Sequence, residues 1–521
     1  MALGQRHAWA GLRPVASRTG AAASFLPVSR RALPILVIGG YALFGLTWAM
    51  SLPPFAAPDE DAHYLRTLGV ANGHLLGPRG RYLSDPALTP RHRAAINDIA
   101  RVVEVPPGLS PVGFACIVHR TRVSAACQNR VVPPRVKVTA VTTVGGYQPL
   151  PYLLPATVIE RADSAPAADR LARLAGLALW LALIAIATLL SWSAAAPAAS
   201  LVGLVAAVTP MVVFVGAGLT GSGPEVAGSI AFAAAAMRLA REPEPSRWVW
   251  AAAAFSGAVL ALSRSPGPLW VLAGLGLLVG LAGPRRLLAL RRAAPAAAAV
   301  TSGVLLVSVV LNRLWESAYG PHIGFGLSPL WSSVGAGRRQ LDEVMLQAIG
   351  RFGYLELGLP ALAYVAWAGL VVALVLLAAV LGTRAERVLL GATVLLAVAL
   401  PVLFYAAVLR NADIPLQGRH VLPLLVLVPL LAGEIVRRRR DALRAVSCRV
   451  LLAGFAVPAA AVQLVAWYVN AHRSAVGTDG PWWFLDRAEW SPPAGWGIWL
   501  ALAVVAAVGL AATALLARRG R

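Results

Sequence analysis

Charged residues are scarce in this sequence. Asp, Glu, Lys and Arg together make up only 13% of the 521 residues, whereas about a quarter is typical of soluble domains. Hydrophobic residues make up 58% of the chain. This balance excludes an ordinary soluble protein and predicts a polytopic membrane protein.

Acidic residues and lysine are also few. The 23 Asp and Glu residues are outnumbered by 46 basic residues, which gives a formal net charge of +23, and Lys137 is the one lysine in the sequence. Such a charge occurs in nucleic-acid-binding proteins. Here, however, the arginines lie in short clusters between apolar runs, which is typical of membrane topology, so we expect no nucleic-acid partner.

The apolar runs have the length of membrane-spanning helices, which is about 17 to 25 residues. They predict an all-α, polytopic integral membrane protein with roughly 11–13 transmembrane helices in a single domain over residues 34–516. The first run is expected to be an uncleaved helix, because it is long enough to span and no small-residue cleavage site follows it. The predicted spans are 34–52, 174–192, 199–218, 225–239, 248–263, 267–283, 294–311, 359–382, 388–409, 421–436, 450–469 and 494–516.

Arginine placement predicts the orientation of these helices. Cytoplasmic segments carry an excess of arginine, so we expect both termini in the cytoplasm, with a basic tail over 1–33 and a short tail over 517–521. The opposite face then carries a large first extracytoplasmic loop, 53–173. The basic segments that share the cytoplasmic side in this topology are 241–247, 285–292, 384–387, 437–444 and 518–521.

The three cysteines divide between the two faces. Cys116 and Cys127 lie in the loop 53–173, whereas Cys448 lies in a basic cytoplasmic segment. An oxidising exterior favours a disulfide between Cys116 and Cys127. A zinc site with His119 fits less well, since zinc sites use closer cysteine spacing and four ligands. Two unpaired buried thiols are the remaining alternative.

Three consecutive acids follow the first span, in "PPFAAPDEDAHYLRTLGVANGHLL" (53–76). Asp59, Glu60 and Asp61 precede His63 and an amphipathic stretch that predicts a helix along the membrane interface. Asp favours the N-cap position, and negative charge suits a helix N-terminus. A solvated loop start is one interpretation, but ionisable residues at membrane depth point to function. Such an acid can accept a proton from a hydroxyl group or hold a metal ion.

Four motifs in their order along the chain resemble those of a bacterial family of predicted membrane proteins, the domain of unknown function 2142. They are the acidic stretch 53–76, "YQPLPYLLPA" (147–156), "ALSRSPGPLW" (261–270) and "LQGRHVLPLL" (416–425). That family is similar to the GT-C superfamily of membrane glycosyltransferases. The resemblance extends over most of the chain and implies a GT-C-like fold.

Enzymes of that superfamily transfer a sugar from a polyprenyl-phosphate carrier to an acceptor on the outer face of the bacterial cytoplasmic membrane. The resemblance implies the same reaction here, with an envelope glycan, a glycolipid or a protein as the acceptor. It implies Asp59 as the general base, and Glu60 as a second catalytic residue that hydrogen-bonds the acceptor or holds a divalent cation. No dedicated metal site is predicted, and that cation is the one cofactor left open.

The lipid phosphate requires positive charge, and the planar fork of Arg pairs bidentately with phosphate oxygens. Arg419, Arg264 and Arg410 each border an apolar helix on the predicted outer face, against the general arginine bias. We expect them to bind the carrier phosphate, in that order of preference. Snorkelling of their side chains to the interface is the alternative.

Four further residues are expected at the substrate site. Tyr147, Gln148 and Tyr152 lie among prolines where the chain returns to the membrane, in a stretch that resembles an aromatic motif of the GT-C superfamily, and His63 lies beside the acids. We expect the aromatic rings to line a groove for the carrier lipid. Interfacial anchoring is the usual alternative for Tyr.

A secondary transporter or a lipid-linked sugar flippase is the alternative function. About twelve helices with both termini on one side suit a transporter, and internal repeats are common in that class. The long loop 53–173 has no counterpart in the second half of the chain, so no internal repeat is visible. This asymmetry favours the enzyme.

Overall fold

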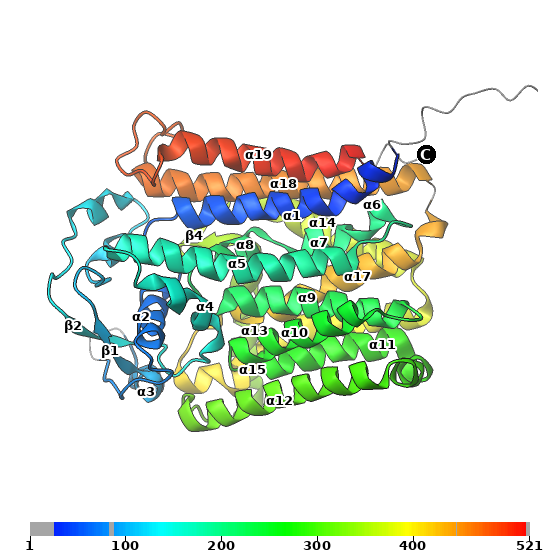
Figure 1. Ribbon diagram of the computed structural model, residues 1–521, viewed down its shortest axis with the longest axis horizontal. Helices are drawn as coiled ribbons and strands as arrows, with labels where there is room; N and C mark the ends of the chain where they lie inside the picture. The colour runs from blue at the N-terminus through cyan, green and yellow to red at the C-terminus, as the bar shows by residue number, and fades with distance from the viewer. Residues whose placement is uncertain (1–25, 83–87, 444, 517–521) are drawn as a thin grey trace, which may run out of the picture.

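The computed structural model describes residues 26–82, 88–443 and 445–516. Most of the predicted N-terminal tail (1–33) and the whole predicted C-terminal tail (517–521) lie outside these residues. Long helices run side by side in a bundle, and a smaller layer of structure covers one end of it (Figure 1). This architecture confirms the prediction of an all-α, polytopic membrane fold.

Ten long helices of the described residues run along the bundle. They are α1 (Leu26–Ser51), α5 (Ala165–Ser191), α9 (Ser222–Arg241), α10 (Arg247–Ser263), α11 (Gly267–Ala293), α12 (Pro295–Tyr319), α14 (Ala361–Leu381), α15 (Arg384–Ala407), α18 (Ala445–Val476) and α19 (Gly495–Leu516).

Two further passes are built from shorter helices. The first consists of α6 (Pro197–Ser200), α7 (Val202–Ala207) and α8 (Pro210–Ala217), and the second of α16 (Gly418–Leu425) and α17 (Leu427–Arg438). Nine helices among the described residues are long and apolar enough to cross a membrane, or ten with the bent pair α6–α7 and α8. Helices α9 and α10 lie among them in the bundle (Figure 1) but are not among these nine, although the sequence predicts spans at 225–239 and 248–263.

Helix α9 lies in the middle of the bundle, and almost all of its residues are buried. Its sequence is rich in Ala and Gly, and such small residues let neighbouring helix backbones approach closely. Gly228 is one contact point, since a Cβ there would lie 3.2 Å from the backbone nitrogen of Leu260 in α10. Helix α9 can therefore carry polar residues into the interior of the bundle.

The predicted continuous span 199–218 is broken in the structure. The chain bends by 66° between the segment Pro197–Ala207 and α8. Thr209 caps the new helix by accepting a hydrogen bond from Val212 N at 3.3 Å, and Pro210 occupies the first turn. Proline lacks the N–H that would continue the preceding helix but fits a helix start, so the apolar run forms two helices instead of one.

The layer at the end of the bundle is formed mainly by the segment between α1 and α5. It contains an antiparallel pair of strands in which Arg101 of β1 is opposite Thr142 of β2. Helix α2 crosses the end of the bundle instead of running along it (Figure 1). The elements are α2 (Glu60–Ala71), α3 (Pro90–Ile99), β1 (Arg101–Val105), η1 (Phe114–Ile117), η2 (Ala125–Arg130), β2 (Val138–Thr142) and α4 (Leu150–Ile159).

Two corrections apply to this segment. Helix α5 begins at Ala165, nine residues before the predicted start at 174, because Asp169 and Arg173 lie inside the helix with fully buried side chains. Asp59 occupies the N-cap position of α2, as expected, but its side chain makes no capping hydrogen bond. Both differences arise because these polar groups pair with distant parts of the chain.

The remaining elements connect the later passes. Helix α13 (Leu330–Gly350) lies between α12 and α14 in sequence and precedes a short antiparallel pair, β3 (Arg351–Phe352) and β4 (Leu357–Gly358). The single-turn helices η3 (Leu409–Ala412) and η4 (Arg440–Ala442) follow α15 and α17.

Candidate active site at the start of helix α2

Asp59 lies at the junction between α1 and α2 in a strained backbone conformation. Its φ of 58° falls in the left-handed region, which costs a non-glycine residue about 1–3 kcal/mol. The carboxylate points to α16, where it accepts a hydrogen bond from Arg419 Nη2. About half of the Asp59 side chain, 49%, remains exposed. Asp59 is therefore the one member of the acidic triplet that is both fixed by a cation and open to a small molecule.

Glu60, next in sequence, is fully buried and faces α5. Arg173 donates to both of its oxygens, from Nε to Oε1 at 2.8 Å and from Nη2 to Oε2 at 2.6 Å. The backbone N–H groups of Leu219 and Ala57 donate to the same carboxylate at 2.8 and 2.9 Å. All of its acceptor capacity is directed to the protein, so Glu60 fits neither the predicted contact with an acceptor nor a divalent cation.

Arg173 fixes the position of the segment between α1 and Asp59. It donates to the backbone oxygens of Leu52 and Pro53, both at 2.8 Å, and pairs with Asp169 one helical turn away at 2.9 Å. Asp169 in turn accepts a hydrogen bond from Phe55 N at 3.3 Å. A buried guanidinium that is shared in this way holds the end of α1 and the start of α2 in one geometry.

Arg419 reaches Asp59 from the start of α16. Its Nε donates to Gln417 Oε1 at 2.6 Å and its Nη1 to Pro58 O at 3.0 Å. The preceding residue must be small, because a Cβ on Gly418 would lie 2.7 Å from a backbone nitrogen of α13. The motif "LQGRH" thus brings Arg419 against the acidic motif, although 360 residues separate Arg419 from Asp59.

His63 and Arg264 complete a group of four charged or titratable residues, the Asp59 cluster: Asp59, His63, Arg264 and Arg419. Burial opposes ionisation of Asp59, but the nearby Arg419, His63 and Arg264 lower the pKa of its carboxyl below the usual value. Burial lowers the pKa of His63 to about 3, against the attraction of Asp59. Asp59 is therefore ionised and His63 neutral near pH 7.

Two tyrosines join α2 to Arg264. Tyr152 OH lies 2.7 Å from His63 Nδ1, and its ring stacks on the imidazole with 5.8 Å between centroids. The Arg264 guanidinium lies 5.7 Å from the centre of the Tyr147 ring, within the range of a cation–π contact. Tyr147 and Tyr152 therefore pack against the Asp59 cluster.

Arg264 is held on its other side by α9. Its Nη1 donates to Ser222 Oγ at 3.0 Å and lies 3.8 Å from Glu225 Oε2. Glu225 also accepts a hydrogen bond from Trp270 Nε1 at 3.0 Å. Glu225 is therefore the counter-ion of the second arginine, a role beyond the helix-end charge that its position suggests.

The other predicted site residues lie away from the cluster or have other partners. Gln148 is buried and donates to Glu316 Oε1 and Asn312 O of α12, both at 3.3 Å. Arg410 donates to the hydroxyl of Ser333 at the start of α13. Gln148 therefore positions the tyrosine stretch against α12, and Arg410 connects η3 to α13.

Asp61, the third acid, pairs with a residue that sequence reasoning missed. Tyr354, in the turn between β3 and β4, donates to Asp61 Oδ1 at 3.3 Å. Burial and the neighbouring charge of Asp59 raise the pKa of Asp61 above its usual value. Among the described residues no cation pairs with Asp61, in contrast to Asp59, which makes Asp61 a useful comparison in mutagenesis.

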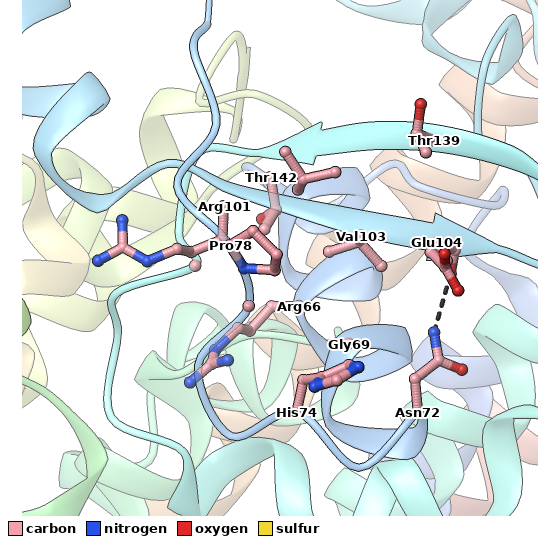
Figure 2. A pocket seen from close by; sticks show the side chains of 13 residues that line it. Arg66, Gly69, Asn72, His74, Pro78, Arg101, Val103, Glu104, Thr139 and Thr142 are labelled. Carbon is pink, nitrogen blue, oxygen red and sulfur yellow. Dashed lines mark hydrogen bonds between the residues drawn. The ribbon is translucent and has the colours of Figure 1, made fainter.

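A cavity of about 210 Å³ lies on the side of α2 that faces the strands. Arg66 of α2 and Arg101 of β1 line it together with His74, Thr139 and Glu104 (Figure 2). Arg66 is also joined to the tyrosines, since it donates to Tyr147 O at 3.0 Å and lies over the Tyr152 ring at 5.7 Å.

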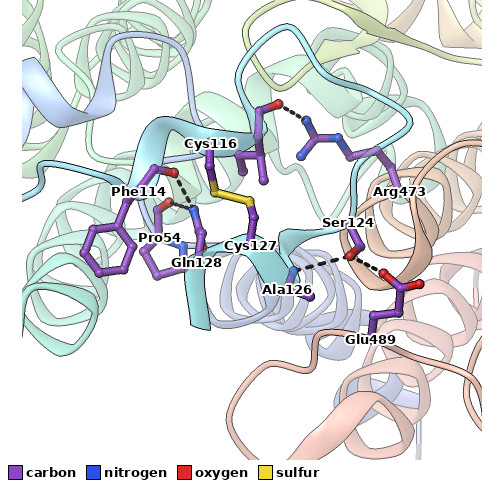
Figure 3. Close-up of a disulfide and its surroundings, with 10 residues drawn as sticks. Pro54, Phe114, Cys116, Ser124, Ala126, Cys127, Gln128, Arg473 and Glu489 are labelled. Atoms are coloured by element: carbon purple, nitrogen blue, oxygen red, sulfur yellow. Dashed lines mark hydrogen bonds between the residues drawn. A yellow bond between two sulfur atoms is a disulfide. The ribbon is translucent and has the colours of Figure 1, made fainter. Parts of the chain in front are cut away.

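Cys116 and Cys127 form a disulfide in the layer over the bundle (Figure 3). The loop that it closes contacts the membrane helices and the segment that precedes Asp59 in sequence. Arg473 of α18 donates to Ile117 O at 2.6 Å, and Gln128 donates to Pro54 O at 2.9 Å. The disulfide therefore braces the segment that carries the acidic motif. The side chain of Cys448 is not among those described.

No three His, Cys, Asp or Glu side chains come together as a metal site in the part of the chain that the structure describes. Chemically, the cluster combines an accessible ionised carboxylate, able to accept a proton from a hydroxyl group, with two guanidinium groups, able to pair with a phosphate.

Sequence reasoning missed Arg173, Glu225, Arg66 and Tyr354. A signal existed for Arg173, because Asp169 and Arg173 have the i, i+4 spacing of a helical ion pair. The partners of the other three lie far away in the sequence or in unrelated motifs.

Comparison with known proteins gave three findings. No curated protein matches the chain. One similar solved structure is the crystal structure of ArnT from Cupriavidus metallidurans bound to undecaprenyl phosphate, at 16% sequence identity and a TM-score of 0.42 over 96% of this chain and 77% of that one. The model of the family described as "Predicted membrane protein (DUF2142)" matches residues 42–428, and the chain belongs to that family.

Proposed function

We propose that the protein is a membrane glycosyltransferase that transfers a sugar from a polyprenyl-phosphate carrier to a cell-envelope acceptor. The observation that carries this proposal is Asp59, an ionised and half-exposed carboxylate in a strained backbone conformation beside Arg419 and Arg264. A strained residue at a polar site is a reason to look for function there. The family to which the chain belongs is similar to the GT-C superfamily, and that similarity points to the same chemistry.

In the proposed reaction, an acceptor hydroxyl oxygen attacks the anomeric carbon of the donor sugar. A carbon–oxygen bond forms there while the bond from that carbon to the phosphate oxygen breaks. The hydroxyl proton passes to Asp59, and the lipid phosphate leaves with one more negative charge. Arg264 and Arg419 stabilise that charge as it develops.

In the proposed reaction, the lipid phosphate and Asp59 compete for Arg419, so binding of the donor would change the basicity of Asp59. Arg419 pairs with Asp59 and helps to lower the pKa of its carboxyl. A lipid phosphate that draws Arg419 away would remove that effect and raise the pKa of Asp59. The carboxylate would then accept a proton more readily in the presence of the donor.

Glu60 has a positioning role in this proposal, in place of the catalytic role expected from the sequence. Its bonds to Arg173 and to the N–H of Leu219 fix the first turn of α2 against α5 and the turn before α9. His63, Tyr147 and Tyr152, which contact one another, form a wall of the proposed site beside Arg264. Arg264 and Arg419 remain the proposed phosphate ligands, and Gln148 and Arg410 support their surroundings.

The orientation is part of the proposal. Both described chain ends, at α1 and α19, lie at the end of the bundle opposite the α2 layer (Figure 1). Basic residues near the same end, at the C-terminus of α9 and of α17, include Arg241 and Arg438. An excess of arginine favours the cytoplasm. We therefore place the termini inside and Asp59 at the outer face of the bacterial cytoplasmic membrane, where a glycan, a glycolipid or a protein is the acceptor.

Complementation of a deletion strain tests the function. Wild type, Asp59→Asn and Asp61→Asn would be compared for protein level, envelope glycans and polyprenyl-phosphate sugars by mass spectrometry. We expect Asp59→Asn to lower transfer by about 100-fold or more, with loss of one glycan linkage and accumulation of the carrier-linked sugar at normal protein level. Asp61→Asn serves as the matched control and should retain most activity.

Full activity of Asp59→Asn would overturn the proposed base. A transporter or flippase would give a different result. Carrier-linked sugar would then accumulate on the cytoplasmic face when the protein is deleted, and purified protein would move the lipid between leaflets without forming a new glycosidic bond.

A further inference from the structure

The cavity between α2 and the strands contains two buried arginines. Arg66 is 2% exposed and Arg101 3% exposed, and both line the cavity (Figure 2). They come from different elements, the middle of α2 and the first residue of β1. Gly145 makes room for Arg101, because a Cβ there would lie 2.5 Å from Cβ and Cγ of Arg101.

Neither guanidinium has a carboxylate partner among the described residues. Arg66 donates to a backbone oxygen, Tyr147 O, and Arg101 donates to the backbone oxygens of Asp98 and Ala100 at 3.0 and 2.8 Å. The Nε of each arginine is buried without a hydrogen-bond partner. Glu104, the acid at the cavity wall, pairs instead with Lys137 at 2.5 Å. Two buried cations, neither paired with a carboxylate among the described residues, thus border one cavity.

The two positive charges also act on each other. Burial, and after it the repulsion of Arg101, lowers the pKa of Arg66 to about 10 against the attraction of Tyr152. Burial also lowers the pKa of Arg101, with a further contribution from Arg79 and an opposing one from Asp98. Buried charges without a counter-ion are unfavourable, so a site that retains two of them is suited to an anion from outside.

The size of the cavity limits the ligand. A water molecule occupies about 30 Å³ in the liquid, and pockets for drug-sized ligands measure about 300–1,000 Å³. A cavity of about 210 Å³ holds a single charged group with the residue that bears it, and it is too small for an oligosaccharide or a lipid tail. The exposed side chains of His74 and Thr139 at its wall add polar contacts suited to sugar hydroxyl groups.

We propose that this cavity is a subsite for an anionic group, a carboxylate or a phosphate, carried by one sugar residue of the acceptor. Arg66 connects the cavity to the candidate active site, because it lies over Tyr152, whose hydroxyl bonds His63. An acidic sugar held there would set the acceptor beside α2, the helix that begins directly after Asp59. The assignment to the acceptor rests on the proposed function, whereas binding of the anion does not.

Isothermal titration calorimetry on the full-length protein in detergent at low ionic strength tests the subsite. The probes are glucuronate, glucose 6-phosphate, inorganic phosphate and glucose. We expect the two acidic sugars to bind the wild type and glucose not to bind. Arg66→Gln and Arg101→Gln should each weaken binding about tenfold or more, because each removes a charge-assisted hydrogen-bond donor.

Three further variants keep the test decisive. Thr139→Glu adds a negative charge at an exposed position of the cavity wall, opposite Glu104 in the strand pair, and it should abolish binding. Arg122→Gln removes an exposed arginine of the same layer, outside the cavity, and should leave binding unchanged. Asp59→Asn, which removes the proposed base, should bind the acidic sugars as the wild type does, so failure of the reaction and failure of the subsite are separable.

Absence of binding to the wild type would overturn the proposal. The same holds if Thr139→Glu and both arginine variants bind as well as the wild type. Inorganic phosphate binding as tightly as glucose 6-phosphate would overturn the assignment to a sugar of the acceptor, because the sugar would then contribute no contact.

Discussion

Arg173 of α5 and Glu60 of α2 form an ion pair in which both side chains are fully buried, with Nη2 and Oε2 2.6 Å apart. The pair joins the first membrane-exit segment to the second long helix. It lies directly beside Asp59 in sequence, yet it serves a different purpose. One carboxylate of the acidic motif holds the backbone in place, and its neighbour is left accessible for chemistry.

Glu60→Gln is therefore expected to lower stability, whereas Asp59→Asn is expected to lower activity. Asp169 still pairs with Arg173 in this variant, but the buried N–H donors that Glu60 satisfies lose a charged acceptor, which typically costs about 1–3 kcal/mol. Thermal unfolding of the purified protein in detergent would measure the loss. Arg122→Gln, which breaks an exposed pair with Asp479, is the matched control, and its effect should stay below about 1 kcal/mol. Equal stability of Glu60→Gln and the wild type would contradict the anchoring role.

Much of the fold follows from sequence patterns, because apolar length alone determines where a chain can cross a membrane. Each predicted span coincides with helices of the described chain, but the boundaries differ in several places. The span 199–218 is bent at Pro210, the span 421–436 is divided between α16 and α17, α5 starts early, and α11 and α12 extend past their predicted ends. The start of α5 in particular is polar because it faces the buried Glu60 and not solvent.

The candidate site could be predicted only in part. The acidic motif, the tyrosines and the arginine of "LQGRH" are recognisable as short motifs, and the structure brings Asp59, Tyr152 and Arg419 to one place. The different roles of Asp59 and Glu60 could not be predicted from the sequence. The two residues are adjacent, and only the fold at the start of α2 directs their side chains to different partners. That direction is determined by Arg173, 113 residues later.

Acid should destabilise the protein through His63. Its folded pKa of about 3 lies below the ordinary value of 6.5, so between these pH values the unfolded chain binds a proton that the folded chain does not. The free energy of unfolding therefore falls as the pH drops below 6.5. At pH 5 the expected loss is about 2 kcal/mol relative to pH 7.

His63→Gln isolates this contribution, because glutamine has no charge to gain and keeps a polar group near Tyr152. Unfolding of both proteins would be measured at pH 7 and pH 5. The variant should lose about 2 kcal/mol less than the wild type over this interval. An identical loss in both proteins would show that His63 ionises as readily when folded as when unfolded.

The disulfide predicts the number of free thiols. The sequence contains three cysteines, of which Cys116 and Cys127 are bonded to each other, so denaturation without reductant should expose one thiol. Reduction should lower the stability of the outer layer by about 2–3 kcal/mol, the usual effect of opening a short loop. Cys448→Ser should leave no free thiol under the same conditions. Three reactive thiols in the wild type would mean that the bond does not form in the cell.

The proposed orientation predicts which face an impermeant reagent reaches. Val132 is 81% exposed in the layer over α2, and the Asp441 side chain is 87% exposed after α17, at the opposite end of the bundle. In a Cys448→Ser background, a cysteine at either position would be treated with a membrane-impermeant maleimide, first on intact cells and then on opened membranes. Before labelling, a mild reductant would release any small external thiol that has formed a disulfide with the new cysteine of Val132→Cys. We expect Val132→Cys to react in intact cells and Asp441→Cys only after the membrane is opened, because the proposed orientation places the arginine-rich end of the bundle in the cytoplasm. The reverse pattern would place Asp59 inside the cell, where a carrier sugar presented at the outer face could not reach it.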